Sequence, residues 1–466
     1  MRCPASHLWI VRDVQVLRVA RTLRSGRETL RVTRRLDRTD KAILGLAIPA
    51  LGALAIDPLL TLADTAFVAQ LGTTELAALG VDTAILGFAF FAFNFLAYVT
   101  TPLVARALGR DLRDEARRWV GDALLLAVGL GVLVTLIVQV AAPLFVELMG
   151  ASPEVAQPAV NYLRIRALAT PAVLIVTTGH GAFRGHKDTR TPLIVAAGVN
   201  GLNLVLDPLL IFTLGMGLEG AAVATVVAQY VGAVWFLWLI RSRRMASRPR
   251  NFRDSLPSLL ALGRKGALLT ARTGMLLAAF IVAASTATRQ GAEAIAAHQL
   301  VAQIFLLSAM LADSLAIAAQ AMVGETAGQG EIGSLHDLSK RLARWGVVAG
   351  LILAMFVAVG RYGLALLASA PEVADLTIEA GGIAAAIEPV AALVFVADGI
   401  FLGLLAFGMM VISTGTGAVA AIGLMVLTPM GDSLPGVWWA LGVMMMVRGL
   451  VFALTYRRSA EIAVRS

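Results

Sequence analysis

A succession of long apolar runs is the feature that most constrains how this chain can fold. Such runs recur between residues 43 and 456, and an α-helix needs about 20 apolar residues to cross a bilayer. The chain is 58% hydrophobic and 15% charged, whereas soluble domains carry about 25% charged residues. The runs are continuous rather than alternating, which is not the pattern of barrel strands. The sequence therefore predicts an all-α integral membrane protein.

Twelve transmembrane spans can be placed along the chain. Their approximate cores are 43–69, 77–105, 120–146, 160–182, 192–213, 219–240, 266–288, 295–322, 345–369, 384–403, 406–428 and 436–456. When loops are assigned alternately to the two sides, the Lys and Arg residues outside the spans fall on one side, except Arg289; Arg361, near the end of the ninth span, also falls on the opposite side. Because cytoplasmic loops are rich in Lys and Arg, this predicts both termini in the cytoplasm and a plasma (inner) membrane location. The net charge of +9 then needs no nucleic-acid partner.

The spans divide six and six around the longest basic loop, and the two halves resemble each other. A constant shift of 219 residues superposes Gly72 on Gly291 and Gly109 on Gly328. A second motif, P-x9-G-x-F-x-G, occurs twice, at Pro171, Gly181, Phe183 and Gly185 and again at Pro389, Gly399, Phe401 and Gly403. Since six spans per half is an even number, both halves keep one orientation in the bilayer. We therefore predict two six-helix lobes related by a pseudo-two-fold axis along the membrane normal, with a site between them.

The predicted organisation has five parts. A basic cytoplasmic tail (1–41) precedes the N-lobe (42–240), a cytoplasmic linker (241–265), the C-lobe (266–456) and a cytoplasmic C-terminal tail (457–466). The first tail could form a basic amphipathic helix on an anionic leaflet, but a solvated tail, or residues upstream of a later true start, is the simpler interpretation.

Ionisable residues inside spans are functional candidates, because each costs about 2.5–3.5 kcal/mol to insert at the helix centre. Asp64 in the first span and Asp207 in the fifth lie in the same half of the bilayer under the predicted topology. Asn203 lies one helical turn from Asp207 and can donate to its carboxylate. If the two spans are neighbours, the acids can hold a proton together and release it when water enters. The alternative is that these residues only link helices through hydrogen bonds.

Further polar residues line up with this hypothesis. Thr225 and Tyr162 could add hydroxyl groups to the site, while Pro49 and Pro208 remove backbone donors and permit bending. Arg272 and Asp313 lie deep in the second half, where they could line a cavity or form a structural polar pair. Asn94, within "FAFFAFNFLAY", is expected to point inward.

Other protein classes find little support. Cys3 is the only cysteine, and the five histidines have no metal-ligand spacing, so we expect no metal site. A membrane enzyme would need a nucleophile, a base or metal ligands, and no such motif occurs. It would also leave the duplication unexplained.

Several sequence blocks, in order, resemble the multidrug and toxic compound extrusion (MATE) family in its DinF-like branch. They are "DTAFVAQLGTTELAALG" (64–80), "AFRGHKDTRTPL" (182–193), "NLVLDPLLIF" (203–212) and "EAIAAHQLVAQIFLLSAMLADSLAIAAQAMVGETAG" (293–328), and the resemblance covers roughly 41–456. It implies a monomeric two-lobe antiporter that exports small organic, often cationic, compounds in exchange for H⁺ or Na⁺. No cofactor beyond the coupling ion is implied.

The resemblance also assigns roles to residues. It implies an N-lobe cation and substrate site of Asp64, Asn203, Asp207, Thr225 and Tyr162, with Pro49 as a bending proline. "ART" (271–273) resembles the span-seven Arg-Thr of the branch, so Arg272 would line the second lobe, with Asp313 and Asn94 near it.

One segment departs from the family pattern, and one alternative function remains. "GIFLGLLAFGMM" (399–410) lacks the charged loop that its counterpart "GAFRGHKDTR" has, which predicts a short or buried turn. A flippase for lipid-linked oligosaccharides, from the same superfamily, is the alternative. Such a flippase should line its cavity with several cations to hold a pyrophosphate, and Arg272 alone lies deep in a span.

Overall fold

The structure is a computed structural model that describes residues 37–247, 252–368 and 370–465. Most of the predicted N-terminal tail lies outside these residues. The chain divides into two units, 1–42 and 43–466. The described residues of the first unit form the start of helix α2, and everything below concerns the second unit.

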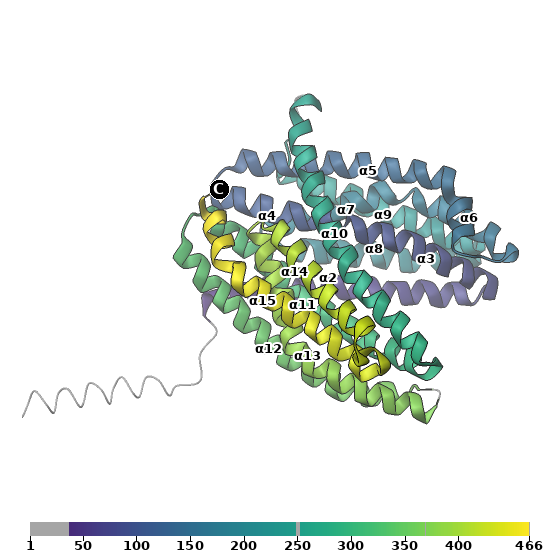
Figure 1. The fold of residues 1–466 in the computed structure, drawn as a ribbon. Helices are drawn as coiled ribbons and strands as arrows, with labels where there is room; N and C mark the ends of the chain where they lie inside the picture. Colours follow the sequence, from purple (N-terminus) through teal and green to yellow (C-terminus); the bar gives the residue numbers. More distant parts are fainter. Residues whose placement is uncertain (1–36, 248–251, 369, 466) are drawn as a thin grey trace, which may run out of the picture. The chain divides into compact units, whose positions relative to one another are not determined.

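The described residues of the first half form helices joined by short turns (Figure 1). The helices are α2 (Arg38–Ala69), α3 (Thr73–Phe93), α4 (Phe95–Gly109), α5 (Arg113–Leu148), α6 (Pro153–Ala167), α7 (Thr170–Gly185), α8 (Arg190–Pro208), the π-helical turn η1 (Leu209–Thr213) and α9 (Gly217–Ser242).

The second half is built in the same way. Its elements are α10 (Phe252–Gln290), α11 (Ala292–Gly328), α12 (Ile332–Ala365), α13 (Pro371–Gly403), α14 (Phe407–Leu427), the 3₁₀ turn η2 (Pro429–Asp432) and α15 (Leu434–Arg465). Within each half the helices pack mainly on one another, for example α5 on α7 and α12 on α13, while α4 and α11 make the principal contact between the halves.

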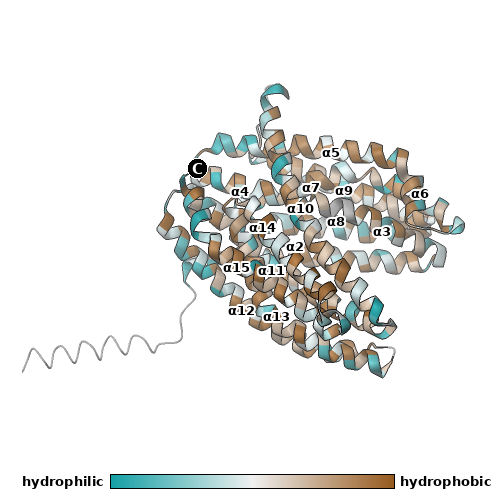
Figure 2. Ribbon diagram, in the orientation of Figure 1, coloured by the Kyte–Doolittle hydropathy of each residue, from teal (hydrophilic) through white to brown (hydrophobic). Residues whose placement is uncertain are grey.

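Each of the twelve predicted spans overlaps one or two of these helices. Among the described residues, ten helices are long and apolar enough to cross a membrane, and α6 with α7, bent by 48°, would make an eleventh span. The remaining predicted span, 77–105, is divided between α3 and α4. Figure 2 shows hydrophobic residues along the helix lengths and hydrophilic residues gathered at helix ends. Exposed apolar side chains such as Val140, Val359 and Leu454 would be costly in water and suit a lipid environment.

Three interruptions break the helical pattern where the sequence predicted continuous spans. Asn94 lies in a turn between α3 and α4. Leu168 and Ala169 separate α6 from α7. Pro208 ends α8 and leads into η1, because proline cannot donate to the preceding turn and local π adjustments satisfy the freed carbonyls.

The internal duplication predicted from sequence appears in atomic contacts between the halves. A Cβ on Gly109 of α4 would overlap the main-chain carbonyl of Glu325 in α11, and a Cβ on Gly328 would overlap the carbonyl of Arg106. The two contacts are related by the same shift of 219 residues. Glycine is therefore required at both positions, since only a hydrogen side chain lets the two helices approach this closely.

The packing inside each half repeats as well. Gly131 packs against the main chain of Pro171, and in the second half Gly350 packs against that of Pro389. The turn after α7 has Lys187 at φ 58°, and the turn after α13 has Leu405 at φ 58°. This second turn spans only 404–406, so the uncharged "GIFLGLLAFGMM" segment forms a short turn, as expected.

Polar contacts join the halves near the loop that follows α7. Lys187 Nζ lies 2.6 Å from Glu325 Oε2 of α11. Asp188 lies beside it and accepts hydrogen bonds from the main-chain N–H and hydroxyl of Thr191, at 2.9 and 2.6 Å, which secures the start of α8. Partial burial works to raise the pKa of Asp188, but the Thr191 hydrogen bonds and the ion pair with Arg243 outweigh it and hold that pKa below its usual value.

Candidate functional site

The first candidate site lies between α2 and α8, where the structure brings Asp64, Asn203 and Asp207 together. The two helices are neighbours, since Thr189 Oγ1 donates to the carbonyl of Leu46 over 2.8 Å and Gly52 packs against Leu193. Asn203 Nδ2 donates to Asp207 Oδ1 over 3.1 Å. The carboxyl groups of Asp64 and Asp207 lie within hydrogen-bonding reach of each other.

The oxygens of this site lack donors. Asp207 is 0% exposed and Asn203 is 1% exposed. Among the described residues no hydrogen-bond donor reaches Asp64 Oδ1, Asn203 Oδ1 or Asp207 Oδ2. Ionised carboxylates only accept hydrogen bonds, so two of them in contact need a proton or another cation between them. Chemically, this arrangement can hold a proton or another cation.

The other predicted members lie around this pair. The buried ring of Tyr162 is close enough to interact electrostatically with Asp64 and Asp207. Thr225 is buried, and its hydroxyl donates to the carbonyl of Ala221 on its own helix over 3.1 Å. The prediction that Thr225 and Tyr162 contribute to the site remains a prediction.

Two further residues near the pair were not assigned to it from the sequence. Asp82 of α3 is 2% exposed, and no described donor reaches its Oδ1. Arg166 of α6 interacts electrostatically with Asp64, Asp82 and Asp207. The sequence pointed to Arg166 only through its position inside the predicted span 160–182. Three acids and one arginine leave this region with an excess of negative charge.

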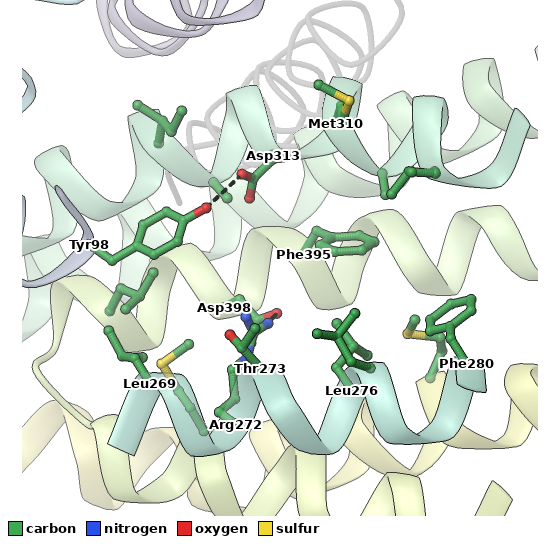
Figure 3. Close-up of a pocket in the computed structure, with 18 of the residues that line it drawn as sticks. Tyr98, Leu269, Arg272, Thr273, Leu276, Phe280, Met310, Asp313, Phe395 and Asp398 are labelled. Carbon is green, nitrogen blue, oxygen red and sulfur yellow. Dashed lines mark hydrogen bonds and ion pairs between the residues drawn. The ribbon is translucent and has the colours of Figure 1, made fainter. Parts of the chain in front are cut away.

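The second candidate site is a cavity of about 390 Å³ in the second half, shown in Figure 3. Its walls are mainly apolar and come from α10, α11 and α13, with Phe280, Phe305 and Phe395 among the lining residues. Tyr98 of α4 is the contribution from the first half. The volume is in the range of sites for small organic ligands.

One wall of the cavity carries a buried charge network. Arg272 forms an ion pair with Asp398 Oδ2, and Arg448 Nη2 lies 2.6 Å from the same oxygen. Arg448 is 0% exposed, whereas Arg272 and Asp398 line the cavity. The sequence suggested Arg272 and Asp313 as a possible polar pair, and the structure instead joins Arg272 to Asp398.

Asp313 faces the cavity from α11 (Figure 3). Its carboxylate accepts a hydrogen bond from the Tyr98 hydroxyl over 3.2 Å. Gln320 Nε2 donates to the Tyr98 carbonyl over 2.5 Å, so Tyr98 is held by α11 at both its main chain and its side chain. Asn94 lies one turn earlier and lines a small adjoining pocket of about 50 Å³ with Tyr98 and Arg272.

Fold and sites together define a class. The described chain is an all-helical, multi-pass membrane protein made of two repeated halves, with a pair of interacting acids in one half and an apolar cavity in the other. Such a duplicated helical architecture is that of membrane transporters. The MatE family model matches residues 49–209 and 273–427, and the chain belongs to this family of transporters, which are not enzymes.

Curated relatives agree with this assignment. The chain is 34% identical over 422 residues to Protein DETOXIFICATION 44, chloroplastic, of Arabidopsis thaliana, covering 87% of this chain and 80% of the relative. It is 30% identical over 433 residues to DNA damage-inducible protein F of Escherichia coli K12, covering 91% and 93%.

Solved structures share the fold. A MATE transporter crystallised with MaD5 superposes with a TM-score of 0.83 at 23% identity, covering 92% of this chain and 98% of that one. The Vibrio cholerae MATE transporter VcmN in its bent form gives 0.83 at 20% identity, covering 91% and 97%. The predicted twelve-helix, two-lobe fold is thereby confirmed.

Proposed function

We propose that this MATE transporter is a secondary active antiporter that exports small organic compounds in exchange for H⁺ or Na⁺. The observation that carries the proposal is that the side chains of Asp64 and Asp207 interact, while no described donor reaches one buried oxygen each of Asp64, Asn203 and Asp207. A buried, unsatisfied acceptor is costly, and a bound cation would satisfy all three at once. Binding of the coupling ion at this site would therefore be favourable.

Alternating access would use the two halves as its moving parts. The halves meet chiefly at α4 and α11, and Pro49 and Pro208 interrupt the hydrogen bonding of the two helices that carry the acids. Cation binding at Asp64 and Asp207 would change the bend of those helices and so couple the ion to the substrate cavity. Because one chain supplies both halves, we propose a monomer.

The charge distribution supports an orientation with both termini in the cytoplasm, in a plasma (inner) membrane. The Lys and Arg residues outside the spans, except Arg289, then face the cytoplasm, and Arg361 lies near the opposite end of its span. Two contacts of the first half with α11 would then lie at the cytoplasmic end. They are those of Lys187 with Glu325 and of Gly109 with the main chain of Glu325. The described state would accordingly be closed toward the cytoplasm.

The test uses inverted membrane vesicles at matched protein levels. A pH gradient and a Na⁺ gradient are imposed separately, and uptake of ethidium (cationic) and of carboxyfluorescein (anionic) is followed by fluorescence. Wild type should accumulate at least one probe under one gradient, and that gradient identifies the ion. Asp207→Asn should abolish the gradient effect.

Glu388→Gln provides the matched control, because Glu388 carries a carboxyl group that is likewise buried, at 2% exposure, but lies in the second half. It should retain gradient-driven uptake. Equal uptake by wild type and Asp207→Asn would contradict the assignment of the coupling site. Failure of wild type to move either probe under either gradient would contradict export of small soluble compounds and favour the flippase alternative.

A further inference from the structure

We propose that Asp82 of α3 is a relay residue, which passes the coupling proton through the hydroxyl group of Tyr162 to the acidic pair. The acidic pair is Asp64 together with Asp207. The proposal rests on the proposed function and deepens it, because it names H⁺ as the coupling ion and gives that ion a route from the outer face to its site.

Asp82 points into the packed interior between α3 and α6, which lie side by side (Figure 1). Leu79 and Leu86, three residues before it and four after it, belong to a buried cluster that also contains Tyr162. Because residues three and four apart share one face of a helix, Asp82 lies on the face of α3 that packs toward Tyr162. It is 2% exposed, so its carboxyl group is enclosed by protein.

Tyr162 is the residue that Asp82 and the acidic pair share. Its side chain interacts electrostatically with Asp82, Asp64 and Asp207. A tyrosine hydroxyl can both donate and accept a hydrogen bond, so it can receive a proton from one carboxyl group while it gives its own proton to a second, ionised one. Such a transfer runs directly or through one water molecule. Tyr162 is therefore placed to join Asp82 to the pair.

The surroundings of Asp82 let it both take up and release a proton. Among the described residues no donor reaches its Oδ1, and a buried carboxylate without a counter-charge is costly, so binding a proton is favourable. From α6, the ionisable groups that face it are Tyr162 and Arg166. The positive charge of Arg166 favours the ionised form. The other helix that packs on α3, α10, is bonded to its far end, where Thr270 donates to the carbonyl of Ala92.

The geometry around Asp82 suits a proton better than a metal cation. Within the described part of the chain, no group of three or more Asp, Glu, His or Cys side chains could hold a metal ion. Asp82 is therefore not a third ligand to an ion held by the acidic pair. The guanidinium group of Arg166 would also repel a metal ion, whereas a proton needs only one acceptor oxygen.

An acidic pocket of about 330 Å³ lies close to the relay, at the starts of α3, α6 and α9. Glu75, Asn161 and Glu219 are among its lining residues. Under the proposed orientation these helix ends face the outside. Glu75 precedes Asp82 by seven residues, which is two turns along one face of α3, and Asn161 adjoins Tyr162. Two carboxylates in this pocket would attract protons toward the relay.

The experiment is a jump to acidic pH on the purified full chain in detergent, followed by stopped flow with the pH indicator pyranine. Exposed carboxyl groups take up protons during mixing, whereas the acidic pair, of which Asp207 is 0% exposed, should give a slower, resolved phase. The double variant Asp64→Asn and Asp207→Asn should lack this phase. Asp82→Asn should keep the phase and slow it about ten-fold or more, since a positioned proton-transfer group contributes at least that much.

Two further variants separate a relay from a structural residue. Asp82→Glu should recover part of the rate, because it restores a carboxyl group. Asp122→Asn is the matched control, since Asp122 is a buried carboxylate outside the relay that accepts from Ser255 Oγ over 2.7 Å, and it should keep the wild-type rate. A phase of full size that is only slower in Asp82→Asn shows that the acidic pair is intact.

The outcomes distinguish this proposal from the proposed antiport. An unchanged rate in Asp82→Asn would overturn the relay and leave the acidic pair as the coupling site. Loss of the phase in both Asp82→Asn and Asp82→Glu would show a structural residue and also overturn it. So would absence of the phase in wild type, since the pair would then exchange no protons. If the phase slows as expected but wild-type vesicles show no gradient-driven uptake, the relay stands and the antiport fails.

Discussion

Gly109 of α4 lies directly against the main chain of Glu325 in α11, and Gly328 makes the equivalent contact with Arg106. The two halves of the protein therefore meet at a pair of glycines related by the internal repeat. A side chain at either position must push the halves apart.

Gly109→Ala should lower the thermal stability of the protein in detergent, by an amount corresponding to about 1–3 kcal/mol, the usual cost of overpacking. Gly328→Ala should behave alike because the contact is symmetric. Gly129→Ala is the control, since a Cβ there meets nothing within 4 Å, and it should be neutral or stabilising by up to about 1 kcal/mol. Similar melting temperatures for Gly109→Ala and Gly129→Ala would contradict the close approach of α4 and α11 at Gly109.

Lys187 and Glu325 should couple energetically across the two halves. Each reversal, Lys187→Glu or Glu325→Lys, should destabilise the protein by about 0.2–1 kcal/mol, as expected for a partly exposed ion pair. The double reversal should recover most of the loss in the same thermal assay. Additive losses in the double variant would mean that the 2.6 Å pair contributes nothing.

Asp398→Asn should be far more damaging than Arg272→Gln. The first change leaves the fully buried Arg448 without its counter-charge, which costs about 3–5 kcal/mol, and it also removes the ion pair of Arg272. The second change leaves an intact Arg448–Asp398 pair. Expression level and melting temperature of the two variants provide the comparison, and equal effects would contradict the network as described.

The helical spans and the repeat were accessible from the sequence for clear physical reasons. An apolar run long enough to cross a bilayer has few alternatives to a helix. The shift that aligns Gly109 with Gly328 is the shift that relates their contacts in space. Asp64 and Asp207 could be paired in advance because both are acids deep in spans of the same direction.

The charge network of the second half could not be predicted in the same way. Arg272 lies in α10, Asp398 in α13 and Arg448 in α15, and spacing along the chain carries no information on which of several buried charges meet. Asp313 was an equally good partner for Arg272 on sequence grounds. Tyr98 ends a phenylalanine-rich run, and nothing in that run indicated that its hydroxyl would donate to Asp313. The break at Asn94 also left no mark on the hydropathy pattern.

The central claim is that Asp64 and Asp207 hold the coupling cation and release it when substrate binds. The most direct measurement adds ethidium or carboxyfluorescein, whichever the wild type transports, to purified protein in weak buffer, and it records released H⁺ with a pH electrode and released Na⁺ with a selective electrode. The account predicts release of one of these ions by wild type and none by the double variant Asp64→Asn and Asp207→Asn, although the probe still binds. Release of the same ion in the same amount by the double variant would contradict it.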